Sequence, residues 1–264
     1  MGTVLTPTEE ALLYPGDDGQ PMAESTEQYR WIVVIKENLE FLLADRPNVF
    51  IAADLAWYPI PVEEPPAPYQ APDVMVVYGR PKGPRRSYLQ WKENNLAPQV
   101  VFEILSESNK TRKGREAMAA KFEFYELHGV EEYYIYDPDD FTLEGWQKQG
   151  DRLVMIPQMS QWVSPRLEIR FDWPPRQELV LYAPNGDPFL SFVELGQQMR
   201  QEQLRANQEQ LRANQAQLRA EQAEQTLQSA VPQLLQLGLS IEQVAQSLGL
   251  PIATVEDIAN AVKD

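Results

Sequence analysis

The chain has 264 residues, 43% of them hydrophobic, which is enough for one large domain plus an appendage. It contains no cysteine and a single histidine, His128, so disulfides, cysteine nucleophiles and zinc sites built from thiolates or imidazoles are excluded, and any bound metal would need oxygen ligands. The formal net charge of −16 argues against a protein coated in nucleic acid.

The sequence contains no segment that is expected to enter or cross a membrane. No run reaches the roughly 18 apolar residues of a transmembrane helix. The N-terminal stretch MGTVLTPTEEALLYPGDDG lacks a basic region followed by an apolar one, as a signal peptide would have. We therefore expect a cytoplasmic protein with no membrane partner.

The first predicted elements are a helix and two strands. An apolar stripe at helical spacing, which Glu24 and Gln28 extend toward its N-terminal end, predicts a helix over residues 21–45. Residues 48–59 predict a strand that ends at Pro59, and a proline-rich loop follows. Residues 71–79, APDVMVVYG, predict a second strand with Asp73 at its start.

A basic loop over residues 79–96 leads to a strand at 97–105 that contains Glu103. This glutamate shares a face with Val101 and Leu105, so solvent on a polar face cannot easily stabilise its charge. An isolated buried carboxylate costs several kcal/mol unless it is paired, protonated or bound to a metal. The common explanation for a glutamate in such a position is that it forms a salt bridge or lies at the end of the strand. A functional role for Glu103 would require partner residues elsewhere in the chain.

The rest of the first domain alternates between helix and strand. Residues 116–129 predict a helix with Lys121 beside its apolar face, and residues 131–138 predict a strand. A hairpin around residues 148–151 and two further strands, at 167–173 and 178–188, complete an α/β domain over residues 10–195.

Composition changes abruptly at residue 196. Leu204, Leu211 and Leu218 repeat every seven residues and predict a heptad helix over residues 196–230. The second core position of each heptad is polar in either register, so a solvated connecting helix competes with a coiled coil.

Residues 231–264 have the spacing of a helix-turn-helix and predict two short packed helices. The second of these helices offers Glu256 and Asp257, with no Arg, Lys or Gln to contact bases or phosphates. A protein-interaction or regulatory role fits this segment better than DNA recognition.

Positive charge gathers in one part of this acidic chain. Residues 80–121 contain ten Lys or Arg and four acidic residues. Solvated loop charge explains such a segment as readily as contact with a phosphodiester substrate does. Within it, Arg112, Lys113 and Arg115 are the candidate substrate-binding residues.

Asp73, Glu103 and Lys121 form the candidate catalytic group. Two carboxylates from adjacent strands can hold one divalent cation, with water in its remaining positions. A neighbouring lysine can orient water or stabilise the charge that develops in phosphodiester hydrolysis. Each residue also has a structural explanation: Asp73 in a turn, Glu103 in an ion pair, and Lys121 extended along its helix.

At these residues the sequence resembles the PD-(D/E)XK nuclease superfamily, specifically its Uma-type endonucleases. The resemblance lies in APDVMVVYG, PQVVFEILS and KFEFYELHGVEEYYIYDP, and covers most of residues 20–195. It implies a restriction-endonuclease-like core, with a mixed central β-sheet flanked by helices. It also implies Mg²⁺ or Mn²⁺ as cofactor, Asp73 and Glu103 as metal ligands, and Glu24 as the acidic residue that completes the site.

Two positions depart from the pattern of that family. Glu107 stands where the family often has proline, and Ala117 where it often has aspartate. The catalytic lysine lies in the following helix, as in the Uma-type pattern, rather than two residues after Glu103. Because the two changes affect the loop that approaches substrate, they concern specificity more than metal binding.

The sequence therefore supports two functional hypotheses. The first is a metal-dependent endonuclease that hydrolyses DNA with metal-activated water. The alternative is a non-catalytic, nuclease-like scaffold that acts through its helical tail. The family resemblance and the heptads both favour a homo-oligomer, most simply a dimer.

Overall fold

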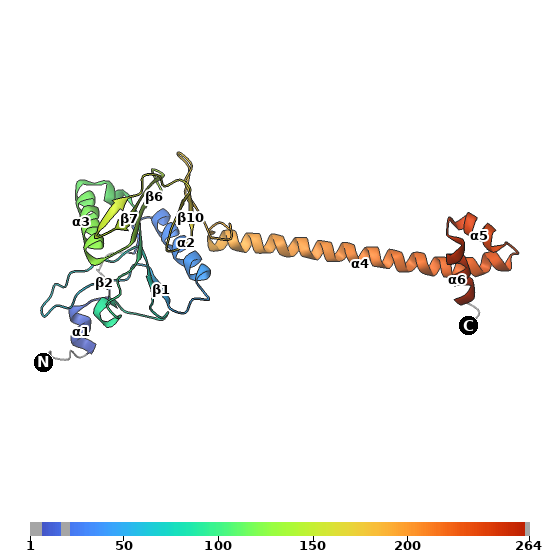
Figure 1. Ribbon diagram of the computed structural model, residues 1–264, viewed down its shortest axis with the longest axis horizontal. Helices are drawn as coiled ribbons and strands as arrows, with labels where there is room; N and C mark the ends of the chain where they lie inside the picture. The colour runs from blue at the N-terminus through green and yellow to red at the C-terminus, as the bar shows by residue number, and fades with distance from the viewer. Residues whose placement is uncertain (1–6, 17–21, 262–264) are drawn as a thin grey trace. The chain divides into compact units, whose positions relative to one another are not determined.

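The computed structural model describes residues 7–16 and 22–261 (Figure 1). The chain divides into two compact units, Met1–Glu194 and Leu195–Asp264, and each is described by itself. Within the described residues, no helix is both long enough and apolar enough to span a membrane.

A six-stranded sheet forms the centre of the first unit. Its strand order is β1-β3-β5-β6-β7-β8, and β5 and β6 are parallel while the other neighbours are antiparallel. The predicted α/β class with a mixed central sheet is therefore confirmed, as is the predicted hairpin, which β7 and β8 form. The bounds are Val49–Ala52 (β1), Val74–Tyr78 (β3), Val100–Ile104 (β5), Glu132–Asp137 (β6), Thr142–Gln149 (β7) and Arg152–Met155 (β8).

Helices cover both faces of this sheet (Figure 1). Helix α2 (Thr26–Leu42) packs Trp31 and Ile35 into a core with Val74 and Phe102. Helix α3 (Arg112–His128) packs on the opposite face, where Tyr125 joins the alternate strand residues, including Val101. The two cores follow from the period of a strand, because successive side chains point to opposite faces.

Two smaller sheets and three short helices complete the first unit. Strands β2 (Trp57–Tyr58) and β4 (Tyr88–Leu89) pair in parallel, and β9, β10 and β11 form a three-stranded antiparallel sheet. The remaining bounds are Pro7–Leu13 (α1), Gln90–Lys92 (the 3-10 helix η1), Glu107–Lys110 (the 3-10 helix η2), Trp162–Val163 (β9), Arg170–Asp172 (β10) and Val180–Tyr182 (β11).

The strand predicted over residues 48–59 is two strands. β1 ends at Ala52, and Asp54 adopts a left-handed backbone conformation with φ of 49°. This conformation interrupts an extended chain. The residues that follow form β2, which pairs with β4 instead of extending the central sheet.

The first residues of two helices, α2 and α3, differ from those that the sequence predicts. Helix α2 begins at Thr26, because the side chain of Ser25 caps it by accepting a hydrogen bond from the Gln28 N–H. Glu24 therefore precedes the helix, and Pro21 lies outside the described residues. Helix α3 begins at Arg112, four residues earlier than residue 116, because Thr111 caps it through the Gly114 N–H.

The second unit is helical. Helix α4 runs from Phe192 to Gln236, so the heptad residues and Val231 belong to one helix. The predicted short helices are α5 (Ile241–Leu248) and α6 (Ile252–Ala261), which pack around Val231, Val244, Ala245 and Val255. By contrast, Leu204, Leu211 and Leu218 are 56%, 59% and 56% exposed.

Candidate active site

Asp73 and Glu103 lie side by side at one end of the central sheet. Val74 of β3 is opposite Phe102 of β5, so one further step of this antiparallel register brings Asp73 to Glu103. Directly opposite residues of antiparallel strands point to the same face. Here that face is covered by α3, and Asp73 and Glu103 are only 8% and 2% exposed.

Each carboxylate has specific partners. Lys121 donates to Glu103 Oε2 at 2.6 Å, and the Tyr125 hydroxyl donates to Glu103 Oε1 at 2.6 Å. The Ile104 N–H donates to Asp73 Oδ2 at 2.6 Å. Lys121 and Tyr125 are one helical turn apart on α3, so a single helix face supplies both groups that hold Glu103. These bonds explain how a glutamate is tolerated inside a buried strand.

Even with these hydrogen bonds, burying two neighbouring carboxylates costs free energy. Burial, and then the nearby charge of Glu103, raise the pKa of Asp73 to about 8, against which Lys121 and the Ile104 N–H act only in part. Burial and Glu103 also raise the pKa of Tyr125, so this side chain stays a neutral phenol that can donate its hydrogen bond. An added positive charge beside Asp73 and Glu103 would relieve the remaining cost.

The residues fit a divalent cation. Both acidic side chains offer hard oxygen ligands, and Asp73 Oδ1 accepts no hydrogen bond from the described residues. Among the described residues, the Tyr133 hydroxyl is buried and has no hydrogen-bond partner. Its pKa is raised by burial and then by the charges of Glu103 and Asp73, and the register of β5 and β6 sets Tyr133 beside Val101, on the sheet face that Glu103 shares.

The number of direct protein ligands is limited. The described residues contain no group of three or more Asp, Glu, His or Cys side chains that could hold one ion. Asp73 and Glu103 would therefore be the two direct carboxylate ligands.

Glu24 lies just before α2 and contacts the residues that follow β5. It accepts a hydrogen bond from the Ser106 hydroxyl at 2.7 Å, and the Ser108 and Ser106 hydroxyls lower its pKa. Gln28 links it to β5, since its amide accepts from the Glu24 N–H at 2.9 Å and donates to the Ile104 carbonyl at 2.8 Å. Within the described residues, no hydrogen bond joins Glu24 to Asp73 or Glu103.

The three candidate substrate-binding residues lie on the first turn of α3, the helix that carries Lys121. Arg112, Lys113 and Arg115 are all exposed to solvent. Arg112 forms an ion pair with Glu116 at 2.9 Å, and Arg115 donates to the Lys110 carbonyl. The structure thus places them on the surface, away from the buried carboxylates.

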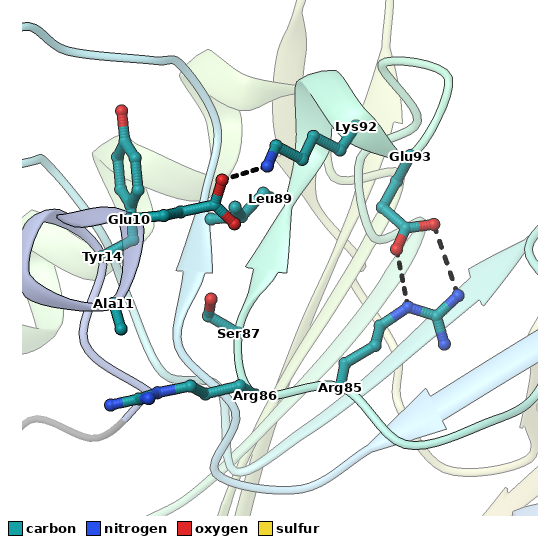
Figure 2. Close-up of a pocket in the computed structure, with 9 residues that line it drawn as sticks. All are labelled: Glu10, Ala11, Tyr14, Arg85, Arg86, Ser87, Leu89, Lys92 and Glu93. Atoms are coloured by element: carbon teal, nitrogen blue, oxygen red, sulfur yellow. Dashed lines mark hydrogen bonds and ion pairs between the residues drawn. The ribbon is translucent and has the colours of Figure 1, made fainter. Parts of the chain in front are cut away.

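The basic loop at residues 79–96 is largely neutralised by its own contacts. Arg80 and Arg85 both pair with Glu93, at 2.6 and 2.7 Å. The loop borders a cavity of about 400 Å³, in which Figure 2 shows the Arg85–Glu93 and Lys92–Glu10 contacts. The cavity lining does not include the buried carboxylates; it consists of Glu10, Ala11, Tyr14, Arg85, Arg86, Ser87, Leu89, Lys92 and Glu93.

Sequence reasoning did not assign a site role to Tyr125. An aromatic residue on the inner face of a helix is typical of core packing, and the Tyr125 ring does stack on Trp57 at 6.2 Å. The spacing in the sequence could have indicated this role, because Tyr125 follows Lys121 by four residues and so lies on the same face of α3.

Comparison with known proteins identifies the family. A family model described as "Uma2: Putative restriction endonuclease" matches residues 14–173. No curated protein matches the chain significantly. A similar solved structure is that of "a putative nuclease belonging to DUF820" from Anabaena variabilis, with 15% identity over 61% of this chain and 89% of that one, and a TM-score of 0.40.

Because this structural similarity is low, the family assignment depends on the family match alone. That match spans more than half of the chain and includes the segments that carry Asp73, Glu103 and Lys121. The family predicted from these motifs is confirmed: the chain belongs to the Uma2 family of restriction-endonuclease-like proteins.

Proposed function

We propose that the protein is a metal-dependent endonuclease that hydrolyses DNA phosphodiester bonds. The observation that carries this proposal is the buried pair Asp73 and Glu103, with Lys121 hydrogen-bonded to one of the two carboxylates. Mg²⁺ or Mn²⁺ held by the pair would activate water as the nucleophile and polarise the scissile phosphate. Family membership supports the same reaction class.

The protein groups have separate roles in this proposal. Lys121, held by Glu103, would donate a hydrogen bond to a phosphoryl oxygen or to the attacking water. Tyr125 and the Ile104 N–H fix the two carboxylates, so that little reorganisation is needed during the reaction. Glu24, which precedes α2 and accepts a hydrogen bond from Ser106 in the loop after β5, would complete the acidic site.

Arg112, Lys113 and Arg115 would bind the phosphates that flank the cleaved bond. Exposed cations at the start of the helix that carries Lys121 suit a sequence-independent contact with a DNA backbone. Replacing Lys113 by Ala should weaken DNA binding and reduce its dependence on salt by about one counterion. An unchanged salt dependence would exclude this contact.

We also propose that copies of the chain associate through α4. The observation that favours this is the repeat of exposed Leu204, Leu211 and Leu218 at heptad spacing. The molar mass in sedimentation equilibrium should exceed that of one chain, and should fall when all three leucines are replaced by Gln. A monomeric wild-type protein would contradict self-association. The scaffold hypothesis would gain if self-association occurs without any nuclease activity.

A direct test of the reaction uses labelled single-stranded and duplex DNA with Mn²⁺. We expect metal-dependent cleavage by the wild-type protein and its loss in Lys121→Met. If neither substrate is cleaved with Mn²⁺ or Mg²⁺, the endonuclease proposal is wrong.

A further inference from the structure

A third carboxylate, Asp54, lies beside the metal-binding pair. Strand β1 pairs antiparallel with β3, and Ala52 is opposite Met75, so the residues just after β1 lie next to those just before β3. The Asp54 N–H donates to the Pro72 carbonyl at 3.0 Å, which fixes Asp54 beside the residue that precedes Asp73. Asp73 is thus flanked by Asp54 on the β1 side and by Glu103 on the β5 side.

The electrostatics agree with this placement. The charge of Asp54 is among the causes that raise the pKa of Asp73, in the same direction as Glu103. Three acidic residues from adjacent segments therefore act on one small volume. Among the described residues, the Tyr133 hydroxyl is buried without a hydrogen-bond partner, and the β5–β6 register sets Tyr133 on the sheet face of Glu103.

The proposed role of Asp54 is not that of a direct ligand. Among the described residues, Asp54, Asp73 and Glu103 do not form a group of three side chains that could hold one ion, so the direct carboxylate ligands in this proposal are Asp73 and Glu103. A divalent cation held by two carboxylates keeps several water ligands. Carboxylates around such a site accept hydrogen bonds from those waters and tune cation affinity.

We propose that Asp54 is a positioning residue of the metal centre, which strengthens Mg²⁺ or Mn²⁺ binding through its charge and by accepting hydrogen bonds from the water ligands of the cation. This inference rests on the proposed function, because it assumes that Asp73 and Glu103 bind the cation. It extends the site to a residue outside the Asp73, Glu103 and Lys121 group.

A structural explanation of Asp54 makes a different prediction. The left-handed φ of 49° favours Gly, Asn or Asp, so Asp54 could serve only the turn between β1 and β2. Asn and Gly can both adopt the backbone conformation of that turn, but neither carries a charge. Asp54→Asn and Asp54→Gly therefore separate the two explanations while they preserve the backbone.

The test is calorimetric titration of the full chain with Mn²⁺, with circular dichroism to confirm that each variant is folded. We expect the Kd for Mn²⁺ to rise about 10- to 100-fold in both Asp54 variants, which is the usual effect of losing such a partner. Glu103→Gln should abolish binding. Asp172→Asn, a half-buried acid on β10, is the matched control and should bind Mn²⁺ as the wild type does.

The outcomes distinguish this inference from the function on which it rests. If the Asp54 variants keep the wild-type Kd within about twofold while Glu103→Gln loses binding, the inference is wrong and the metal centre stands. If the wild-type protein does not bind Mn²⁺ or Mg²⁺, both the metal centre and the role of Asp54 are refuted.

Discussion

Replacing Asp73 by Asn should stabilise the metal-free protein, although Asp73 is buried and hydrogen-bonded. Its pKa is raised from an ordinary value of 3.8 to about 8. At pH 7 the folded state therefore retains a proton that the unfolded chain releases. With about 1.4 kcal/mol per pKa unit, holding this proton destabilises the fold by up to about 4 kcal/mol.

Asn avoids this cost because it is neutral at every pH. Its side-chain oxygen can still accept the hydrogen bond from the Ile104 N–H, so the main contact of Asp73 is kept. The gain depends on pH with a defined sign. Since the folded pKa lies above the unfolded one, the wild-type protein loses stability relative to the variant as the pH rises from about 4 to about 8. Below about pH 4 the advantage of Asn disappears.

The assay is thermal and urea unfolding in EDTA at several pH values. For a unit of this size, 1 kcal/mol shifts Tm by roughly 2–4 °C, so an increase of up to roughly 8–16 °C is expected at pH 7. Asp172→Asn should show no comparable increase. A variant that is less stable than the wild type at every pH would refute the reasoning, because Asp73 would then be a structural ion-pairing residue.

Three further outcomes follow from contacts of α3. Lys121→Met should destabilise the metal-free protein by about 3 kcal/mol in urea unfolding, since it leaves Glu103 buried without its counter-charge. Unchanged stability would contradict the ion pair. His128 should titrate below its ordinary pKa of 6.5 in proton NMR, because burial beside Phe124 lowers its pKa, and stability should fall as the pH drops below about 6.5. As the chain has one histidine, its signal needs no assignment, and a pKa of 6.5 or above would exclude this burial effect. Gly114→Ala should destabilise the start of α3, because a Cβ there would overlap the Ser108 carbonyl, and faster amide exchange after Thr111 would detect the change; wild-type exchange would show that the loop adapts.

Local patterns in the sequence were enough to nominate Asp73, Glu103 and Lys121 as candidate site residues. Alternation in a strand shows that Glu103 must be buried, and helical spacing shows that Lys121 lies at an apolar margin. The register of β3 and β5 then sets Asp73 beside Glu103, and α3 brings Lys121 within hydrogen-bonding distance of Glu103.

Other features depend on long-range contacts that a local pattern cannot contain. Asp54 has the character of a turn residue, and only the pairing of β1 with β3 reveals its place beside Asp73. The position of Glu24 depends on the Ser25 cap and on hydroxyls from the loop after β5. The β1–β2 break likewise follows from pairing of β2 with β4, about 30 residues away.

The proposed role of Glu103 is to hold a catalytic divalent cation from its buried position in β5. Its most direct test is incubation of supercoiled plasmid with wild-type protein and with Glu103→Gln, in Mg²⁺, in Mn²⁺ and in EDTA. We predict nicked or linear plasmid only with the wild-type protein and only with a divalent metal. Cleavage that survives in Glu103→Gln or in EDTA, or a plasmid that stays intact under every condition, would contradict the claim.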